Sequence, residues 1–483
     1  MRNKTPTGTV DTGHVVRELG NWRRSSRTGP AYHCLTDSLR MLIIDGRLPV
    51  ESRMPSERAL ADALRVSRTT VTAAYAELGR TGYLTARRGT RSAIALPHTP
   101  TSSASAVAHP GVINLAVAAL PAPAGAVQQG FVEATRQIAG YLHDLGYEMR
   151  GTPVLRDAIA QRYCHRGLPT SPEQIMVTSG AQHAISLILS AYVQPGSRVL
   201  VEQPTYHSAL TAINNAGAVA VATALTDEGW DLPAIRTAAR QLAPALAYLV
   251  PDNHNPTGLS MSHDDRNELC AIISQTRTRT LIDETMTDLW LDAPMPPPLI
   301  AGMTSHTELV MTVGSLSKLF WGGLRIGWIR AEPTTLARIA AIRPSADLGT
   351  SVIEQLAGAW LLRERAEEVL PGRRDLLREQ RELLVDLLAQ RLPDWCPLPG
   401  TGGMSLWVRL PVPVSSALCA AASRLGVEIP PGPRFGVDGT LERFVRIPYT
   451  LPAADLTAAV DVLHRAWNTI TGDVITGPTG AVI

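Results

Sequence analysis

The pattern of apolar and polar positions divides the chain into two structured regions. In residues 31–96, apolar side chains recur every three or four positions, as they do in short helices. In residues 112–470, apolar runs typical of strands alternate with longer helical stretches. Strands that are apolar along their whole length are buried on both faces, so this alternation predicts an α/β domain with a mostly parallel central sheet. The runs expected to form its strands are QIMVTSG (174–180), SRVLVEQP (197–204), LAYLVPDN (246–253), RTLIDET (279–285) and ELVMTVGS (308–315).

Three segments lack such a pattern. Residues 1–30 are polar and aperiodic, and we expect a flexible arm there. Residues 97–111, PHTPTSSASAVAHPG, have the composition of a linker. Residues 471–483 are expected to form a disordered tail. The chain of 483 residues therefore divides into an arm, a small domain at 31–96, a linker, a large domain at 112–470 and a tail.

Composition argues against several classes of protein, namely membrane-spanning, secreted and disulfide-rich proteins. The sequence has no apolar run long enough for a membrane span and no apolar core of a signal peptide near its start. Its five cysteines are scattered without a CxxC pair, which argues against a disulfide framework or a metal site and fits the reducing cytoplasm. Residues 1–96 hold 16 Lys and Arg against 8 Asp and Glu. This basic front suggests a polyanionic partner, although an Arg-rich N-terminal region without one remains the alternative.

The small domain has the pattern of a winged helix-turn-helix. Ser56 follows Pro55 as a candidate cap of one helix, and Ser67 is a candidate cap of the next. The inward stripe of that second helix comprises Val71, Ala74, Tyr75 and Leu78. A short strand, the basic turn at 87–89 and a second strand follow, which predicts a wing. The second helix would enter the major groove of double-stranded DNA, unless this is a small helical module for protein contact.

This region resembles the GntR family of bacterial DNA-binding domains. The resemblance rests on PSER (55–58), VSRTTV (66–71) and GYL (82–84). It implies that the following residues contact DNA: Arg58, Ser67, Arg68, Thr69, Thr70 and the wing residue Arg88. The wing RRGTRS lacks the second glycine that such domains often carry, which weakens the inference for Arg88.

Lys318 is the first sign of chemistry in the large domain. The chain has 43 arginines and two lysines, the other being Lys4. A lysine amine can lose its proton and attack a carbonyl, whereas a guanidinium stays charged. Lys318 is therefore a candidate for a Schiff base, with a chance surface lysine as the alternative from composition alone.

Other features follow the predicted strands. The turn at Gly180 and Ala181 opens a helix whose free N–H groups suit a phosphate, and Ser315, Ser317 and Arg325 could reach the same group. Three further positions complete the set with Lys318: Tyr206, which could stack on a flat ring or be a core residue; Asn255, in a rigid turn; and Asp283, at the end of an apolar strand.

These features resemble a fold type I aminotransferase. The matching motifs are NPTG (255–258), DE (283–284), SLSK (315–318) and LRIGW (324–328), and the resemblance covers most of residues 112–470. It implies a smaller C-terminal α+β subdomain and the cofactor pyridoxal 5′-phosphate (PLP). The implied roles are an imine at Lys318, a ring-nitrogen contact from Asp283, a ring-hydroxyl contact from Asn255, stacking by Tyr206, and a phosphate site at Gly180, Ala181, Ser315, Ser317 and Arg325.

Three further positions follow from the same resemblance. Arg446 in RFVRIPYTLP corresponds to the arginine that binds an amino-acid carboxylate, with a surface arginine as the alternative. Tyr147 in GYEMRGT corresponds to a tyrosine that reaches the cofactor of a dimer partner, with a core tyrosine as the alternative. Met286 stands where aminotransferases commonly place a tyrosine that tunes the imine, which puts efficient transamination in doubt.

The combination of the two domains resembles the MocR family of transcription regulators. That resemblance implies a homodimer that binds two DNA half-sites and responds to PLP or an amino acid as effector. Genes of vitamin B6 or amino-acid metabolism are the first candidates for its targets. The alternatives are a true aminotransferase with an appended DNA-binding domain, and a regulator that also turns over its effector.

Overall fold

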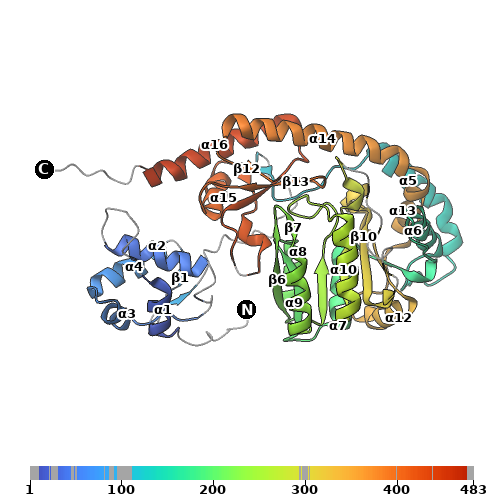
Figure 1. Cartoon of the computed structure of the whole chain (residues 1–483). Helices are drawn as coiled ribbons and strands as arrows, with labels where there is room; N and C mark the ends of the chain where they lie inside the picture. Colours follow the sequence, from blue (N-terminus) through green and yellow to red (C-terminus); the bar gives the residue numbers. More distant parts are fainter. Residues whose placement is uncertain are drawn as a thin grey trace. The chain divides into compact units, whose positions relative to one another are not determined.

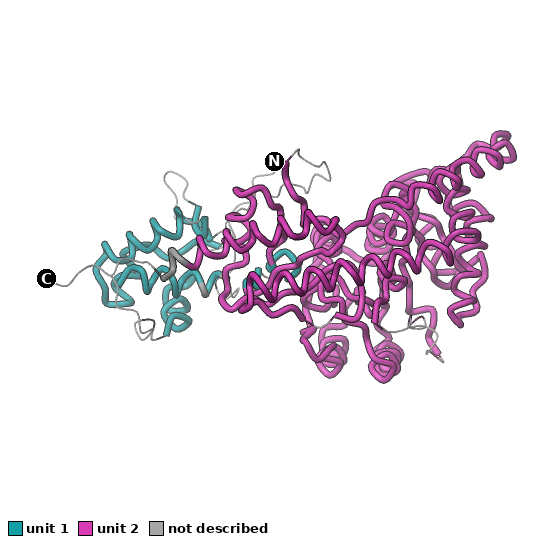
Figure 2. Tube along the Cα trace, turned by 90° about the horizontal axis from the view of Figure 1, so that it is seen from above, with its two compact units in different colours: residues 1–107, 432–442 teal, residues 108–431, 443–483 magenta. Residues whose placement is uncertain are grey.

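The structure is a computed structural model that describes residues 10–20, 22, 31–44, 48, 52–80, 82–85, 92–94, 111–292, 295, 298, 303, 305–398, 400–437 and 439–475. The chain forms two compact units (Figure 2). One contains residues 1–107 and 432–442, and the other contains residues 108–431 and 443–483. Nothing in the sequence predicts that residues 432–442 group with the first unit.

Helices dominate the first unit. Its elements are α1 (Thr12–Leu19), α2 (Ala31–Ile44), α3 (Glu57–Leu64), α4 (Arg68–Arg80), β1 (Leu84–Thr85) and β2 (Ala93–Ile94). The predicted inward stripe of α4 is buried, and it packs with Leu35 and Leu39 of α2 in one apolar core. The two strands pair antiparallel, with Leu84 opposite Ile94. This is the predicted arrangement of helices followed by a wing. The basic turn with Arg88 and most of the predicted linker lie outside the described residues.

The expectation of an aperiodic arm at residues 1–30 is wrong for residues 12–19. Asp11 caps α1 by accepting a hydrogen bond from the backbone N–H of His14, and Gly20 ends the helix. Val15 and Leu19 are buried in the core of the unit. Their spacing of four residues places both on one face, so a short amphipathic helix is stabilised by packing that the local sequence does not reveal.

An eight-stranded sheet organises the second unit. Its strands are β4 (Ile175–Thr178), β5 (Arg198–Gln203), β6 (Val219–Thr226), β7 (Gly229–Trp230), β8 (Leu246–Leu249), β9 (Thr280–Asp283), β10 (Val310–Ser315) and β11 (Gly327–Arg330). The strand order is β4-β11-β10-β9-β8-β5-β6-β7. The central pairings are parallel, whereas β11 runs antiparallel to both of its neighbours and β7 runs antiparallel to β6. All five predicted strands are present, and the predicted fold class is confirmed.

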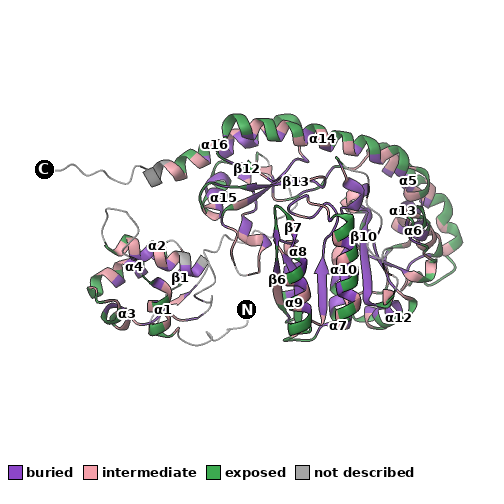
Figure 3. Cartoon of the chain, in the orientation of Figure 1, coloured by how far each residue is buried: buried purple, intermediate pink, exposed green. Residues whose placement is uncertain are grey.

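Helices surround this sheet and leave their outer faces exposed (Figures 1 and 3). They are α5 (Ala124–Gln137), α6 (Pro153–His165), α7 (Ala181–Tyr192), α8 (His207–Asn215), α9 (Leu232–Leu242), α10 (His263–Thr276), α11 (Leu316–Leu319), α12 (Pro333–Ile342) and α13 (Val352–Glu364). The strands β4, β8, β9, β10 and β11 are buried at every position, as expected for strands that are covered on both faces.

A smaller α+β layer completes the second unit. Its elements are β12 (Cys396–Pro397), β13 (Ser405–Arg409) and β15 (Phe444–Pro448) in one antiparallel sheet, β3 (Ile113–Asn114) paired with β14 (Val427–Glu428), and the helices α14 (Ala366–Arg391), α15 (Ser415–Arg424) and α16 (Ala453–Ile475). Helix α16 extends five residues beyond the predicted domain end at 470. Within the described ranges, no helix combines the length and apolarity needed to cross a bilayer.

Candidate functional site

The start of α4 presents a cluster of polar side chains in the first unit. Ser67 accepts a hydrogen bond from the backbone N–H of Thr70, and its hydroxyl lies 2.8 Å from that of Thr69 and 2.7 Å from that of Thr70. Ser67 thereby satisfies one of the free N–H groups at the helix start and fixes the first turn. The side chains of Ser67, Arg68 and Thr69 are exposed, so this turn is accessible to a ligand.

Glu57 of α3 holds the two helices of the pair in register. Its carboxylate accepts a hydrogen bond from the Thr72 hydroxyl at 2.7 Å and lies 3.7 Å from Nε of Arg68. Arg58, also predicted to contact DNA, is exposed and pairs only loosely with Asp62, at 4.0 Å. Because exposed ion pairs of this kind contribute little, Arg58 and Arg68 can exchange these partners for phosphates at small cost.

In the second unit, Lys318 lies in α11, directly after β10. Its Nζ donates a hydrogen bond to the carbonyl oxygen of Ala118 at 2.6 Å. Burial, with a smaller contribution from the positive charge of Arg446, lowers the pKa of Lys318 to about 8, although Asp283 acts in the opposite direction. An amine in this environment is a usable nucleophile near neutral pH.

Asp283 lies at the end of β9 with its side chain buried. One oxygen accepts the backbone N–H of Thr285 at 2.9 Å, and the other accepts the Tyr248 hydroxyl at 2.8 Å. Burial raises the pKa of Asp283, and hydrogen bonds from the side chain and backbone of Thr285 and from Tyr248 oppose that rise. A carboxylate held in this way is stabilised further by any cation that reaches it, including a protonated ring nitrogen.

Arg446 and Asn255 face each other across two parts of the unit. Arg446, on β15, is buried and donates to the carbonyl oxygen of Ala116 at 2.6 Å and to Oδ1 of Asn255 at 3.5 Å. Tyr206 precedes α8 and lies near Tyr248, where it opposes ionisation of the Tyr248 hydroxyl. The structure therefore gathers Lys318, Asp283, Asn255, Arg446 and Tyr206 around the carboxyl ends of β5, β8, β9 and β10, where open α/β sheets bind ligands.

The predicted phosphate residues meet at the start of α7. Arg325 donates to the carbonyl oxygen of Ser179 at 2.8 Å, and a Cβ atom on Gly180 would lie 2.8 Å from the same guanidinium. Gly180 has a positive φ of 95° and provides no side-chain cap, so the first N–H groups of α7, including that of Ala181, face away from any capping side chain. Only glycine fits this close approach, and the resulting cradle suits a phosphate.

Two hydroxyl groups border this cradle. Ser315 donates to the backbone oxygen of Ile326 at 3.0 Å, and its hydroxyl lies 2.9 Å from that of Ser317. Together with the buried carboxylate Asp283 and the amine of Lys318, the residues present fit the chemical groups of PLP: an aldehyde, a ring nitrogen and a phosphate.

Two predicted positions differ from the rest. Tyr147 is 64% exposed, so it is not a core residue. Met286 is buried in the apolar core of the smaller layer, and its backbone oxygen accepts a hydrogen bond from Asn253 at 2.8 Å. The buried thioether of Met286 cannot donate a hydrogen bond.

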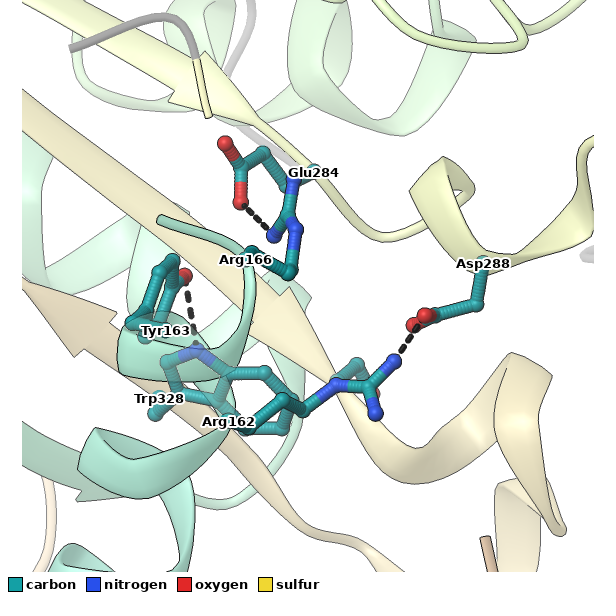
Figure 4. A pocket seen from close by; sticks show the side chains of 7 residues that line it. Arg162, Tyr163, Arg166, Glu284, Asp288 and Trp328 are labelled. Atoms are coloured by element: carbon teal, nitrogen blue, oxygen red, sulfur yellow. Dashed lines mark hydrogen bonds and ion pairs between the residues drawn. The ribbon is translucent and has the colours of Figure 1, made fainter. Parts of the chain in front are cut away.

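A small polar cavity adjoins Ser315 (Figure 4). Two ion pairs among the residues that line it secure the segment that follows Asp283. Arg166 of α6 pairs with Glu284 at 2.7 Å, and Arg162, one helical turn earlier, pairs with Asp288. Both ion pairs are largely buried, so they are little screened by salt. Helix α6 thus holds the chain on both sides of Met286.

Some groups that contribute to the candidate site do not belong to any of the sequence motifs. The carbonyl oxygens of Ala116 and Ala118 receive the hydrogen bonds of Arg446 and Lys318, and backbone groups carry no side-chain signature. Tyr248 carries a polar hydroxyl group within the buried strand LAYL. This hydroxyl in an otherwise apolar run is the one sequence feature that could have pointed to Tyr248.

Comparisons with known proteins agree with this geometry. Residues 110–463 match the model of the family "Aminotransferase class I and II", and residues 31–94 match "Bacterial regulatory proteins, gntR family". The uncharacterized HTH-type transcriptional regulator YisV of Bacillus subtilis is 29% identical over 89% of this chain and 95% of its own length. The probable rhizopine catabolism regulatory protein MocR of Rhizobium meliloti is 26% identical, covering 83% and 86% of the two chains.

Two further matches are a transcriptional repressor and an aminotransferase. The vitamin B6 salvage pathway transcriptional repressor PtsJ of Salmonella typhimurium is 27% identical over 89% of this chain and 97% of its own length. The crystal structure of LysN, the α-aminoadipate aminotransferase of Thermus thermophilus, superposes with a TM-score of 0.67 at 26% identity, covering 75% of this chain and 93% of LysN. With a gntR-type DNA-binding domain at its front and an aminotransferase domain behind it, the chain belongs to the class I and II aminotransferase family and has the architecture of MocR-type transcriptional regulators.

Proposed function

We propose that this chain is a cytoplasmic, homodimeric transcription regulator whose large domain binds PLP through a Schiff base at Lys318. The observation that carries the proposal is the environment of Lys318, which is half-buried near Asp283 and Arg446 and has a pKa lowered to about 8. PLP, once attached to an amine, withdraws electrons from it. Lys318 supplies that amine, Asp283 keeps a proton on the ring nitrogen, and the start of α7 with Arg325 holds the phosphate.

The effector is PLP, alone or together with an amino acid. Arg446 is a buried guanidinium, of the kind that binds an α-carboxylate with two parallel hydrogen bonds. Two of its acceptors are the carbonyl oxygen of Ala116 and the amide oxygen of Asn255, and a carboxylate forms a stronger hydrogen bond with a guanidinium than these neutral groups do. The relation to PtsJ makes genes of vitamin B6 metabolism the first targets to test.

Dimer formation is supported by exposed apolar side chains in one region of the second unit. Gly349 packs against the backbone of Glu148, so the segments around residues 348 and 147 are adjacent. The exposed residues there are Leu142, Leu145, Tyr147 and Leu348. A patch of this kind is typical of a protein interface. We propose that a second copy of the chain covers it and that Tyr147 reaches the cofactor site of that copy.

A second function, amino-acid transamination, is favoured by one specific observation. Lys318, Asp283 and Arg446 are all present and adjacent, as a transaminase requires. Met286 argues against efficient turnover, because no phenol is available there to adjust proton transfer at the imine.

An absorption spectrum tests both functions. We expect PLP to produce a visible absorption band with wild-type protein and none with Lys318→Ala. A regulator binds its promoter with an affinity that PLP changes about fivefold or more, which is a typical allosteric coupling. If a keto acid accumulates over many turnovers and promoter affinity does not respond to PLP, the chain is an enzyme and the proposed regulation is wrong.

A further inference from the structure

Three buried polar side chains lie on adjacent strands at the floor of the candidate site. Strand β8 lies between β9, which carries Asp283, and β5, which carries Glu202. Tyr248 on β8 is opposite Leu281 in one pairing and opposite Val201 in the other. The side chains of Asp283, Tyr248 and Glu202 are at most 3% exposed, so their interactions take place away from water.

Glu202 is satisfied by neighbours other than Asp283. Its oxygens accept the indole N–H of Trp230 at 2.6 Å and the backbone N–H of Val250 at 2.7 Å, and Nε2 of His254 lies 3.1 Å away. Its negative charge acts on the neighbouring strand β8 and on β9 beyond it, where it opposes ionisation of Tyr248 and Asp283. Asp283 therefore needs donors of its own to remain a carboxylate.

Thr285 and Tyr248 supply such donors among the described residues. Thr285 contributes its side chain and its backbone N–H, and no substitution of that residue except proline removes the backbone donor. Tyr248 contributes its hydroxyl, at 2.8 Å from Oδ2. Burial raises the pKa of Tyr248 well above its ordinary value, so the phenol keeps its proton and remains a donor throughout the physiological range.

We propose that Tyr248 is a positioning residue that keeps Asp283 ionised and oriented toward the ring nitrogen of PLP. The proposal rests on the PLP-binding function proposed above. Without the phenol, burial and the charge of Glu202 favour the neutral carboxyl group. A neutral Asp283 would no longer stabilise a protonated ring nitrogen, so bound PLP would withdraw fewer electrons from the amine that holds it, and the nitrogen of that amine would be more basic.

Among the described residues, few titratable groups face the carboxylate of Asp283. They are Tyr248 from β8, Glu202 from β5 and Lys318 from α11, and Arg446 of β15 faces Lys318 in turn. Lys318 would hold PLP, and Glu202 has its own donors. The Tyr248 hydroxyl donates to Asp283 from a separate strand, so its removal leaves the hydrogen bonds from Thr285 in place.

The test is a pH titration of the visible absorption band of the PLP-loaded, full-length protein. For Tyr248→Phe we expect the midpoint to rise by about one pH unit, a tenfold change in the proton equilibrium. Tyr449→Phe is the matched control, because Tyr449 is also fully buried but donates to the carbonyl oxygen of Gly402, at 3.3 Å. We expect the midpoint of the control to equal that of wild type.

A second measurement covers the case in which Tyr248→Phe does not fold. Site-specific incorporation of 3,5-difluorotyrosine at position 248 retains the hydroxyl and makes it a stronger donor, so we expect the midpoint to fall. An unchanged midpoint in both Tyr248 variants, or in the fluorinated protein alone if the other is unfolded, overturns the inference. Absence of the band from wild-type protein instead overturns the proposed PLP-binding function.

Discussion

Lys318 and Arg446 donate hydrogen bonds to two carbonyl oxygens of one short segment. Nζ of Lys318 lies 2.6 Å from the oxygen of Ala118, and Nη2 of Arg446 lies 2.6 Å from that of Ala116. The two cations are therefore held close together in a buried site, where the charge of one disfavours the charge of the other. Their proximity links the reactivity of the amine to the residue predicted to bind the effector.

The first prediction concerns the pH dependence of PLP attachment. The pKa of Lys318 is lowered to about 8, so the neutral amine dominates above that pH and its fraction falls about tenfold for each pH unit below it. We expect the rate at which the visible band forms to rise with pH and level off near pH 8. Stopped-flow absorbance between pH 6 and about 10 measures this rate. A rate that is still rising tenfold per unit at pH 10 would show an unperturbed lysine.

The second prediction concerns the effect of removing the positive charge of Arg446 beside Lys318. Arg446→Gln should shift the midpoint of that rate profile to higher pH, because one of the two causes that lower the pKa of Lys318 is lost. Affinity for an amino-acid effector should fall at least about tenfold, as expected for a charged hydrogen bond. Arg443→Gln is the control, since Arg443 is exposed and donates to the carbonyl oxygen of Pro411. Equal profiles for the two variants would contradict the role assigned to Arg446.

For DNA binding, the third prediction compares two arginines of α4. Arg68, in the first turn, and Arg80, in the last, have side chains that are 73% and 72% exposed. Arg68→Ala should weaken binding and reduce the dependence of log affinity on log salt by about one phosphate contact, whereas Arg80→Ala should change neither. Fluorescence anisotropy with an operator recovered by in vitro selection gives both quantities. The PLP absorption band should be the same in both variants.

The fourth prediction concerns the oligomeric state. Leu145 is 88% exposed within the apolar patch that includes Leu142 and Tyr147. Leu145→Asp should shift the protein from dimer to monomer in sedimentation velocity, because a charge buried at an interface is costly. Leu425→Asp is the control, an exposed leucine elsewhere in the second unit. If both variants sediment as wild type does, the patch is not the dimer interface.

Much of the fold could be predicted from local patterns. Strands β4, β5, β8, β9 and β10 coincide with apolar runs bounded by polar or turn residues, because a strand buried on both faces requires such a run. Helix α1 could not be predicted in the same way. It has eight residues, too few to be stable alone, and it persists because Val15 and Leu19 pack into the core of its unit.

The sequence by itself determined the chemical parts of the candidate site: a lysine in an arginine-rich chain, an aspartate at the end of a buried strand, and a glycine at the start of a helix. These follow from residue type and position within one element. Only the tertiary structure decided their environment. The lowered pKa of Lys318 depends on burial and, to a smaller extent, on Arg446, 128 positions away along the chain, and Asp283 accepts a hydrogen bond from Tyr248 of a neighbouring strand. Burial and charge act through space, so such couplings are decided by packing and leave no pattern along the chain.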